Sequence, residues 1–309
     1  MTSRPGWGQV RTGINSVSRP GHFDFVLLAI LAFSIPAEGT TIPPIWESAF
    51  GNPIISSNLV SNDATVGLGF NFSLFGKSYT SASVSSKGYV TFGGAAGAQP
   101  TANASQFLQG IPRIAPAWYD VDVEDSNGTI LFHSFQNRAV FTFLDVGSYA
   151  PPPGLSVAPS NLATYQLTVF DDGTVVFGYA SFNALDPTVT GVANSLLGSP
   201  QAMIGISPGF GVSDPGSVNL LSAIQSAPGF AYTTASSAVY QYVDNGGITG
   251  ADNTNLAGIN FIFTPVGVTN WTVTTQPQLA VATPEPAAFW LVLCSFASLA
   301  ALRTRKTHA

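Results

Sequence analysis

Hydrophobic residues between positions 40 and 283 occur in short runs that alternate with polar residues, and clusters of Gly, Pro, Asn and Asp separate the runs. No segment there sustains a period of 3.6 residues over three helical turns. Short β-rich runs with this spacing are typical of a sandwich or barrel. We therefore expect an all-β fold, a single antiparallel β-sandwich-like domain. Strands are expected at residues 67–74, 79–84, 89–92, 117–124, 129–135, 139–146, 164–170, 174–182, 202–207, around 240 and at 259–264.

The register of one hairpin follows from its buried face. Asp171, Asp172 and Gly173 separate two apolar strands, and a two-residue loop would mix the faces of those strands. A three-residue loop with Gly173 at positive φ keeps six apolar side chains on one side, so we predict that loop. The opposed pairs are then Val169 with Val175, Leu167 with Phe177, and Tyr165 with Tyr179.

An acidic stretch lies within the expected strand 117–124. Asp120, Asp122 and Glu124 alternate with valines, so a continuous strand would place the three carboxylates on one face, about 6.6 Å apart per pair. A hairpin loop over the next residues would bring His133 onto the same face, opposite Asp120 or Asp122 according to the loop length.

Three interpretations of this stretch stay open. The carboxylates can form a solvated face with His133 in a loose ion pair. They can bind calcium, because oxygen ligands at alternate positions suit that ion. They can form the carboxylate pair of a glycoside hydrolase, although any i, i+2 pair has a compatible spacing. The candidate calcium ligands are Asp120, Asp122, Glu124, Asp125 and Asn127.

The N-terminal residues have the pattern of an export signal. Arg4, Arg11 and Arg19 precede an apolar run at 25–35, and small residues follow at Ala37 and Gly39. We expect residues 1–39 to be a signal peptide that the Sec translocon handles. Residues 40–62 are then a lead-in, residues 63–265 the β domain, and residues 266–283 an extended Thr/Pro linker.

The C-terminal residues 284–309 form a tail with three parts. Pro284, Glu285 and Pro286 precede an uncharged apolar stretch of 16 residues, and Arg303, Arg305 and Lys306 follow it. A helix of that length covers roughly 24 Å, which is short for a bilayer. The order of the parts closely resembles the PEP-CTERM sorting signal of Gram-negative bacteria. The resemblance implies recognition and removal of the tail by an exosortase, transient anchoring in the membrane, and a place at the cell surface or in an extracellular, exopolysaccharide-rich matrix.

Six strand segments in order resemble the NIDO domain, the extracellular nidogen-like module. They cover about residues 60–210, and the resemblance implies a non-catalytic domain associated with cell–matrix adhesion. The segments are LGFNFSLFGKSY at 68–79, VSSKGYVTFG at 84–93, IAPAWYDVD at 114–122, AVFTF at 139–143, YQLTVFDDGTVVFGY at 165–179 and IGIS at 204–207.

Composition narrows the functional classes. Residues 40–283 carry four Lys/Arg against thirteen Asp/Glu, a formal net charge of −9, which disfavours nucleic acid and anionic lipid as partners. The one cysteine, Cys294, lies in the tail and His133 is the one histidine of 40–283, so cysteine nucleophiles and multi-histidine zinc sites are excluded there.

We therefore expect a non-catalytic surface or matrix protein that binds a glycan or a matrix protein, with contact loops at 93–110, 150–163 and 183–200. Two alternatives stay open. One is a carbohydrate-active enzyme that uses Asp120, Asp122 or Glu124, and the other is a purely structural matrix component.

Overall fold

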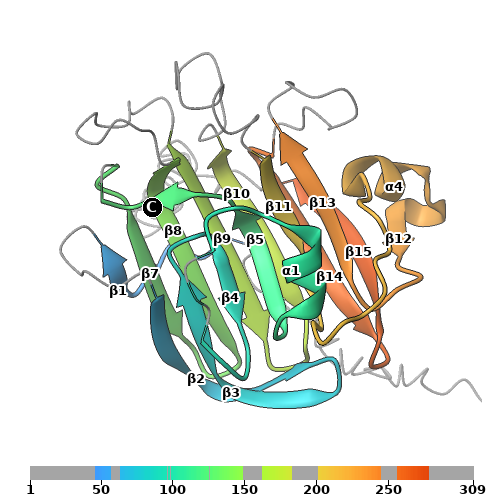
Figure 1. Cartoon of the computed structure of the whole chain (residues 1–309), viewed down its shortest axis with the longest axis horizontal. Helices are drawn as coiled ribbons and strands as arrows, with labels where there is room; N and C mark the ends of the chain where they lie inside the picture. Colours follow the sequence, from blue (N-terminus) through green and yellow to red (C-terminus); the bar gives the residue numbers. More distant parts are fainter. Residues whose placement is uncertain are drawn as a thin grey trace, which may run out of the picture. The chain divides into compact units, whose positions relative to one another are not determined.

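The computed structural model describes residues 46–56, 63–95, 97, 99–124, 126–148, 162–182, 201–244 and 256–277, which belong to one compact unit. These residues form two antiparallel sheets, so the predicted all-β, sandwich-like fold is confirmed (Figure 1). Helices within the described ranges are short: α1 (Ala104–Gln109), α4 (Leu220–Ser226) and the 3-10 turn η2 (Pro228–Phe230). None of the helices in these ranges is long and apolar enough to cross a membrane.

The smaller sheet has six strands, and its central strands are buried on both faces. Ile114 and Ala117 of its third strand point into the space between the sheets, whereas Ala115 and Trp118 pack beneath α1 on the other face. This double burial explains why residues 114–118 are apolar without clear alternation. The strand order is β13 (Val239–Asp244), β11 (Gln201–Ser207), β5 (Arg113–Trp118), β4 (Tyr89–Thr91), β3 (Lys77–Ser85) and β2 (Asp63–Leu74).

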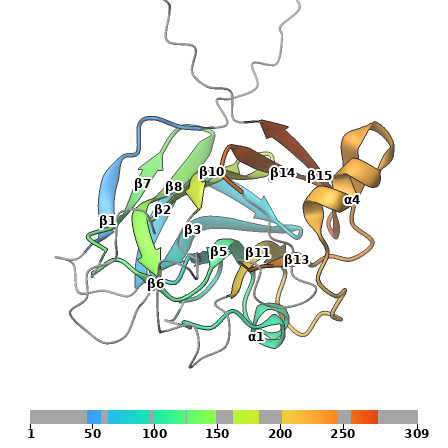
Figure 2. The same cartoon turned by 90° about the horizontal axis from the view of Figure 1, so that it is seen from above.

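The larger sheet has nine strands and closes the main core. Seen from above, the two sheets lie as layers, with α1 outside the smaller one (Figure 2). The strand order is β1 (Asn52–Ser56), β7 (Thr129–Ser134), β8 (Arg138–Ser148), β9 (Ala163–Phe170), β10 (Val175–Phe182), β14 (Ile259–Val266), β15 (Asn270–Pro277) and β12 (Ala231–Thr233), and β6 (Val121–Asp122) pairs with β8 off this path.

The predicted register of the β9–β10 hairpin is confirmed. Val175 pairs with Val169, Phe177 with Leu167 and Tyr179 with Tyr165, and all six side chains are buried. Gly173 has φ +87°, as the three-residue loop requires. The buried face therefore determines this register.

The expected strand 117–124 is wrong, because the chain turns sharply after β5. The N–H of Val121 donates to the carbonyl of Tyr119 at 2.8 Å, which closes a γ-turn centred on Asp120. The chain then leaves the smaller sheet, and β6 pairs with β8 of the larger sheet. The expected β6–β7 hairpin is also wrong, because β6 and β7 both pair antiparallel with β8.

Two strands lie outside the expected domain limits of 63–265. β1 lies within the expected lead-in 40–62 and pairs with β7. β15 lies within the expected linker 266–283 and pairs with β14 along its full length. The prediction of an extended linker from 266 is therefore wrong for residues 270–277, since Trp271 and Val273 of this strand are buried in the core.

Candidate functional site

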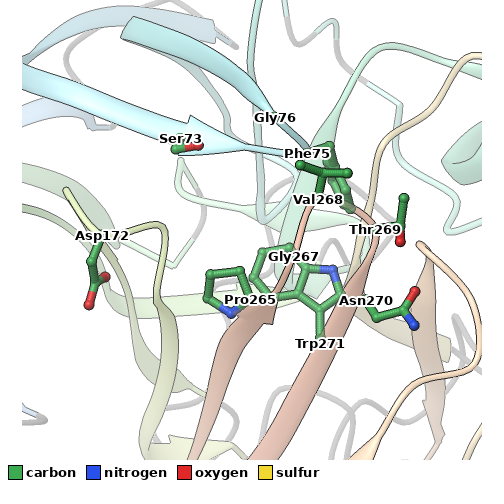
Figure 3. A pocket seen from close by; sticks show the side chains of 10 residues that line it. All are labelled: Ser73, Phe75, Gly76, Asp172, Pro265, Gly267, Val268, Thr269, Asn270 and Trp271. Atoms are coloured by element: carbon green, nitrogen blue, oxygen red, sulfur yellow. The ribbon is translucent and has the colours of Figure 1, made fainter.

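Three β-turns meet at one end of the sandwich, which we call the turn end. They are the β2–β3 turn at Phe75 and Gly76, the β9–β10 turn at 171–173 and the β14–β15 turn at 267–269. Between them lies a hollow of about 130 Å³ (Figure 3). Its lining consists of Ser73, Phe75, Gly76, Asp172, Pro265, Gly267, Val268, Thr269, Asn270 and Trp271.

The β2–β3 turn is held in place by a contact with β15. Leu74 pairs with Lys77, so the loop has two residues, and both Phe75 and Gly76 have positive φ, at 51° and 73°. Positive φ is common for glycine but rare for phenylalanine. The ring of Phe75 packs edge-on against Trp271, with ring centroids 5.5 Å apart. This tertiary contact stabilises a turn that local preference alone does not favour.

Trp271 lies at the base of the hollow. Its side chain is 2% exposed, and its backbone exchanges two hydrogen bonds with Thr234, at 3.0 Å and 2.8 Å. The indole Nε1 is buried, and within the described part of the chain it has no hydrogen-bond acceptor. Buried tryptophan N–H groups normally find an acceptor. The indole N–H is therefore a buried donor that has no partner among the described residues.

Polar side chains stand around this base. Figure 3 shows Asp172 on one side of Pro265 and Trp271, and Thr269 and Asn270 on the other. One carboxylate oxygen of Asp172 accepts the N–H of Thr174 at 2.8 Å, which shapes the β9–β10 turn. The second oxygen adds an acceptor to the rim, so the hollow carries both donors and acceptors.

Exposed hydrophobic side chains gather around the hollow. Val266 and Val268 of the β14–β15 turn are 47% and 63% exposed, and Phe210 is 64% exposed. Phe210 belongs to the same end, because Lys77 Nζ lies 4.7 Å from the centre of its ring and Lys77 directly follows Gly76. Within the described ranges, three of the four exposed large hydrophobic residues thus lie at the turn end.

The fourth exposed residue, Phe230, stands beside the edge strand β12, in the same local sequence as Phe210. Each follows Pro-Gly, and each has a positive φ, 57° for Phe210 and 60° for Phe230. A left-handed backbone conformation is unfavourable for a residue such as phenylalanine. The repeated Pro-Gly-Phe sequence was the signal in residues 208–235 that pattern reasoning missed.

The acidic stretch is placed differently from the turn end. Asp120 forms an ion pair with Lys87, with 2.6 Å between Oδ1 and Nζ, and Asp122 Oδ1 accepts the N–H of Glu124 at 2.9 Å. Asn127 is exposed at φ 53°, and Asp125 lies outside the described residues. No three acidic, histidine or cysteine side chains that could hold a metal gather in the described ranges, and the calcium site stays a prediction.

The prediction that His133 lies on the acidic face is wrong. Strand β7 pairs with β1 and β8, so His133 lies opposite Val140. Its Nδ1 is 2.7 Å from the carbonyl oxygen of Ala49, and its ring stacks on Phe135 with centroids 4.0 Å apart. The ring therefore belongs to the outer face of the larger sheet.

Several predicted segments lie outside the described residues. They include the signal peptide at 1–39, most of the expected contact loops 150–163 and 183–200, and the apolar stretch 287–302. The residues of the sorting motif also lie there: Pro284, Glu285, Pro286, Arg303, Arg305 and Lys306. The third expected contact loop, 93–110, is held against the smaller sheet, since Trp118 Nε1 donates to the carbonyl of Gln99 at 2.7 Å.

Comparison with known proteins identifies the family of the β domain. A family model described as NIDO related matches residues 48–265, about the span of β1 to β14. No curated protein and no solved structure gives a match. The match does not reach residues 284–309, so the PEP-CTERM signal stays a prediction. The NIDO domain is of an extracellular type. Because the family model covers more than half of the chain, the chain belongs to the NIDO-related family.

Proposed function

We propose that this protein is an exported, non-catalytic surface or matrix protein that binds a matrix component through its turn end. The observation that carries the proposal is the exposure of Phe210, Val266 and Val268 at the turn end, the end of the sandwich that contains the hollow. Single exposed hydrophobic residues are ordinary, but a group of them rimmed by polar residues marks an interaction site. A sandwich that presents turns from a rigid scaffold is suited to this use.

The charge distribution supports an uncharged partner. Lys87 and Arg138 are each in an ion pair, with Asp120 and Glu47, and Arg113 is buried against the rings of Tyr89 and Trp118. Of the four cations of residues 40–283, all in the described part, this leaves Lys77 beside Phe210. One lysine in a chain segment of net charge −9 is a poor basis for binding nucleic acid or anionic lipid.

The proposal includes the route to the surface. The Sec translocon exports the chain through residues 1–39, and an exosortase recognises Pro284, Glu285 and Pro286 and removes the tail. Mature surface protein should then lack residues 287–309, which intact-mass spectrometry checks. Surface-exposed protein that retains this segment would show that the tail is a plain membrane anchor.

The binding proposal is tested with two matched phenylalanines. Phe210→Ser and Phe230→Ser each remove an exposed ring from a Pro-Gly-Phe turn, one at the turn end and one beside β12. We expect Phe210→Ser, and likewise Val268→Asp, to reduce retention of the protein in extracted extracellular matrix at least tenfold. Phe230→Ser should keep retention at the wild-type level. Equal retention of all three variants would overturn the proposal.

A further inference from the structure

We propose that the hollow at the turn end binds one neutral sugar unit of a polysaccharide. This inference rests on the proposed binding function and names the class of partner. It follows from the size of the hollow, from the mixture of donors and acceptors in its lining, and from the apolar side chains at its rim.

The size of the hollow limits what enters it. A volume of about 130 Å³ exceeds the space that a single water molecule needs and falls below the roughly 300–1,000 Å³ of pockets for drug-sized ligands. The hollow therefore takes one small group of a larger ligand, whose remainder lies across the rim. A repeating polymer of small rings has this form.

The lining calls for a group that both donates and accepts hydrogen bonds. Thr269 and Asn270 offer a hydroxyl and an amide group as donors, and Asp172 offers carboxylate oxygen on the other side of Pro265 (Figure 3). A hydroxyl group has one donor and two acceptor sites, so adjacent sugar hydroxyls satisfy both. A methyl or other aliphatic group would leave these donors and acceptors without partners.

The charges at the turn end favour a neutral sugar over an acidic one. Asp171 and Asp172 both lie on the β9–β10 turn and repel carboxylate and phosphate groups. Lys77 Nζ lies over the ring of Phe210, and one lysine does not outweigh these two carboxylates. The exposed faces of Phe210 and Val268 suit the apolar C–H faces of a pyranose ring.

The inference is tested with the full-length mature protein on an array of neutral bacterial oligosaccharides built from hexoses and N-acetylhexosamines. Asp172→Asn changes the acceptor at the rim but keeps the oxygen that caps Thr174, and Asp171→Asn makes the same charge change on the same turn outside the lining. We expect Asp172→Asn to weaken the best array signal about tenfold and Asp171→Asn to leave it unchanged. Thr269→Val, which removes a hydroxyl from the lining and keeps the shape of the side chain, should also weaken binding about tenfold.

Each outcome separates the two proposals. A wild-type protein that binds no neutral sugar, but is retained in protein-rich matrix in a Phe210-dependent way, overturns the sugar inference and leaves the binding function intact. If Asp172→Asn, Asp171→Asn and Thr269→Val all bind sugar as the wild type does, the sugar lies elsewhere on the molecule and the inference is overturned. If neither Phe210→Ser nor Val268→Asp reduces matrix retention, the proposed binding function itself is overturned.

Discussion

Gly173 occupies a position at which a side chain has no room. Its φ of +87° lies in the left-handed region, and a Cβ added there would lie 2.9 Å from the carbonyl oxygen of Ser73. Gly211 has a similar φ of +79°, but a Cβ added to it would meet nothing within 4 Å. The two glycines therefore separate the cost of the backbone conformation from the cost of a steric clash.

We expect Gly173→Ala to lower the free energy of unfolding by about 2–3 kcal/mol and Gly211→Ala by about 1 kcal/mol. The difference arises because Ser73 and the β9–β10 turn must move apart in the first variant only. Chemical denaturation of the two variants measures it. Equal losses would mean that the turn end yields freely to an added methyl group.

Glu47 links the segment before β1 to the outer face of the larger sheet through an ion pair and hydrogen bonds. Its carboxylate accepts from Arg138 at 2.7 Å, and its backbone exchanges hydrogen bonds with the buried side chain of Gln166, at 2.9 Å and 2.7 Å. Burial alone would raise the pKa of Glu47, but the hydrogen bond and charge of Arg138 hold that pKa below its ordinary value. The carboxylate is therefore more readily ionised in the folded state.

Glu47→Gln should lower the free energy of unfolding by about 1–2 kcal/mol at neutral pH, because Arg138 loses its charged partner. The folded pKa is depressed, so the stabilisation is present above the ordinary glutamate pKa of about 4.3 and disappears as the pH falls through the lowered value. Unfolding curves at pH 7 and pH 3 measure this. A difference between wild type and variant that stays constant with pH would contradict the ionic origin.

At the scale of strands, the sequence predicts best those elements in which apolar residues alternate with other residues over six or more positions. β9 and β10 satisfy this condition, and their register follows. β15 also alternates at Trp271 and Val273, but its threonines and glutamine suggested a linker. The sequence predicts one strand where the structure has β5 and β6, because the alternating acidic residues give no sign of the γ-turn at Asp120. The hollow depends on turns brought together by the sheet, so no local pattern indicated it.

The assignment of β15 to the core is tested by two valines. Val273 of β15 is fully buried, and Val268 of the adjacent turn is 63% exposed. Val273→Ala should lower the free energy of unfolding by about 1.5–3 kcal/mol through lost burial and a residual cavity, and Val268→Ala by less than about 0.5 kcal/mol. Thermal unfolding of both variants measures the difference. If both changes are equally mild, residues 270–277 are not a core strand.

At the scale of the whole molecule, tyrosines lie inside the layers of the sandwich. Tyr165 and Tyr179 are fully buried, and the hydroxyl of Tyr179 donates to the carbonyl of Pro116 at 2.5 Å, which joins the larger sheet to the smaller one. Burial raises the pKa of Tyr165 and of Tyr179 well above the ordinary value. The folded state thus holds both phenols in the neutral form.

These tyrosines predict the behaviour of the fold in alkali. The pKa values of these tyrosines are raised in the folded state. Their contribution to the free energy of unfolding is therefore fully present below the unfolded pKa of about 10, and it is lost as the pH rises from there through the folded pKa values. The free energy of unfolding should therefore fall steeply above pH about 10. Tyr179→Phe should be less stable at pH 7 by about 1 kcal/mol and decline less steeply in alkali. Denaturation between pH 7 and 11 tests this, and parallel declines would contradict it.

The direction of β15 sets how far the protein reaches from its point of attachment. The strand starts at the turn end with Asn270 and runs eight residues, about 25 Å, to Pro277. The chain from there to the proposed sorting motif at Pro284 spans at most about 25 Å, whereas a linker from residue 266 would have allowed about 60 Å. A protein held by that motif would carry its hollow at the end of the domain away from the anchor, within about 50 Å of it.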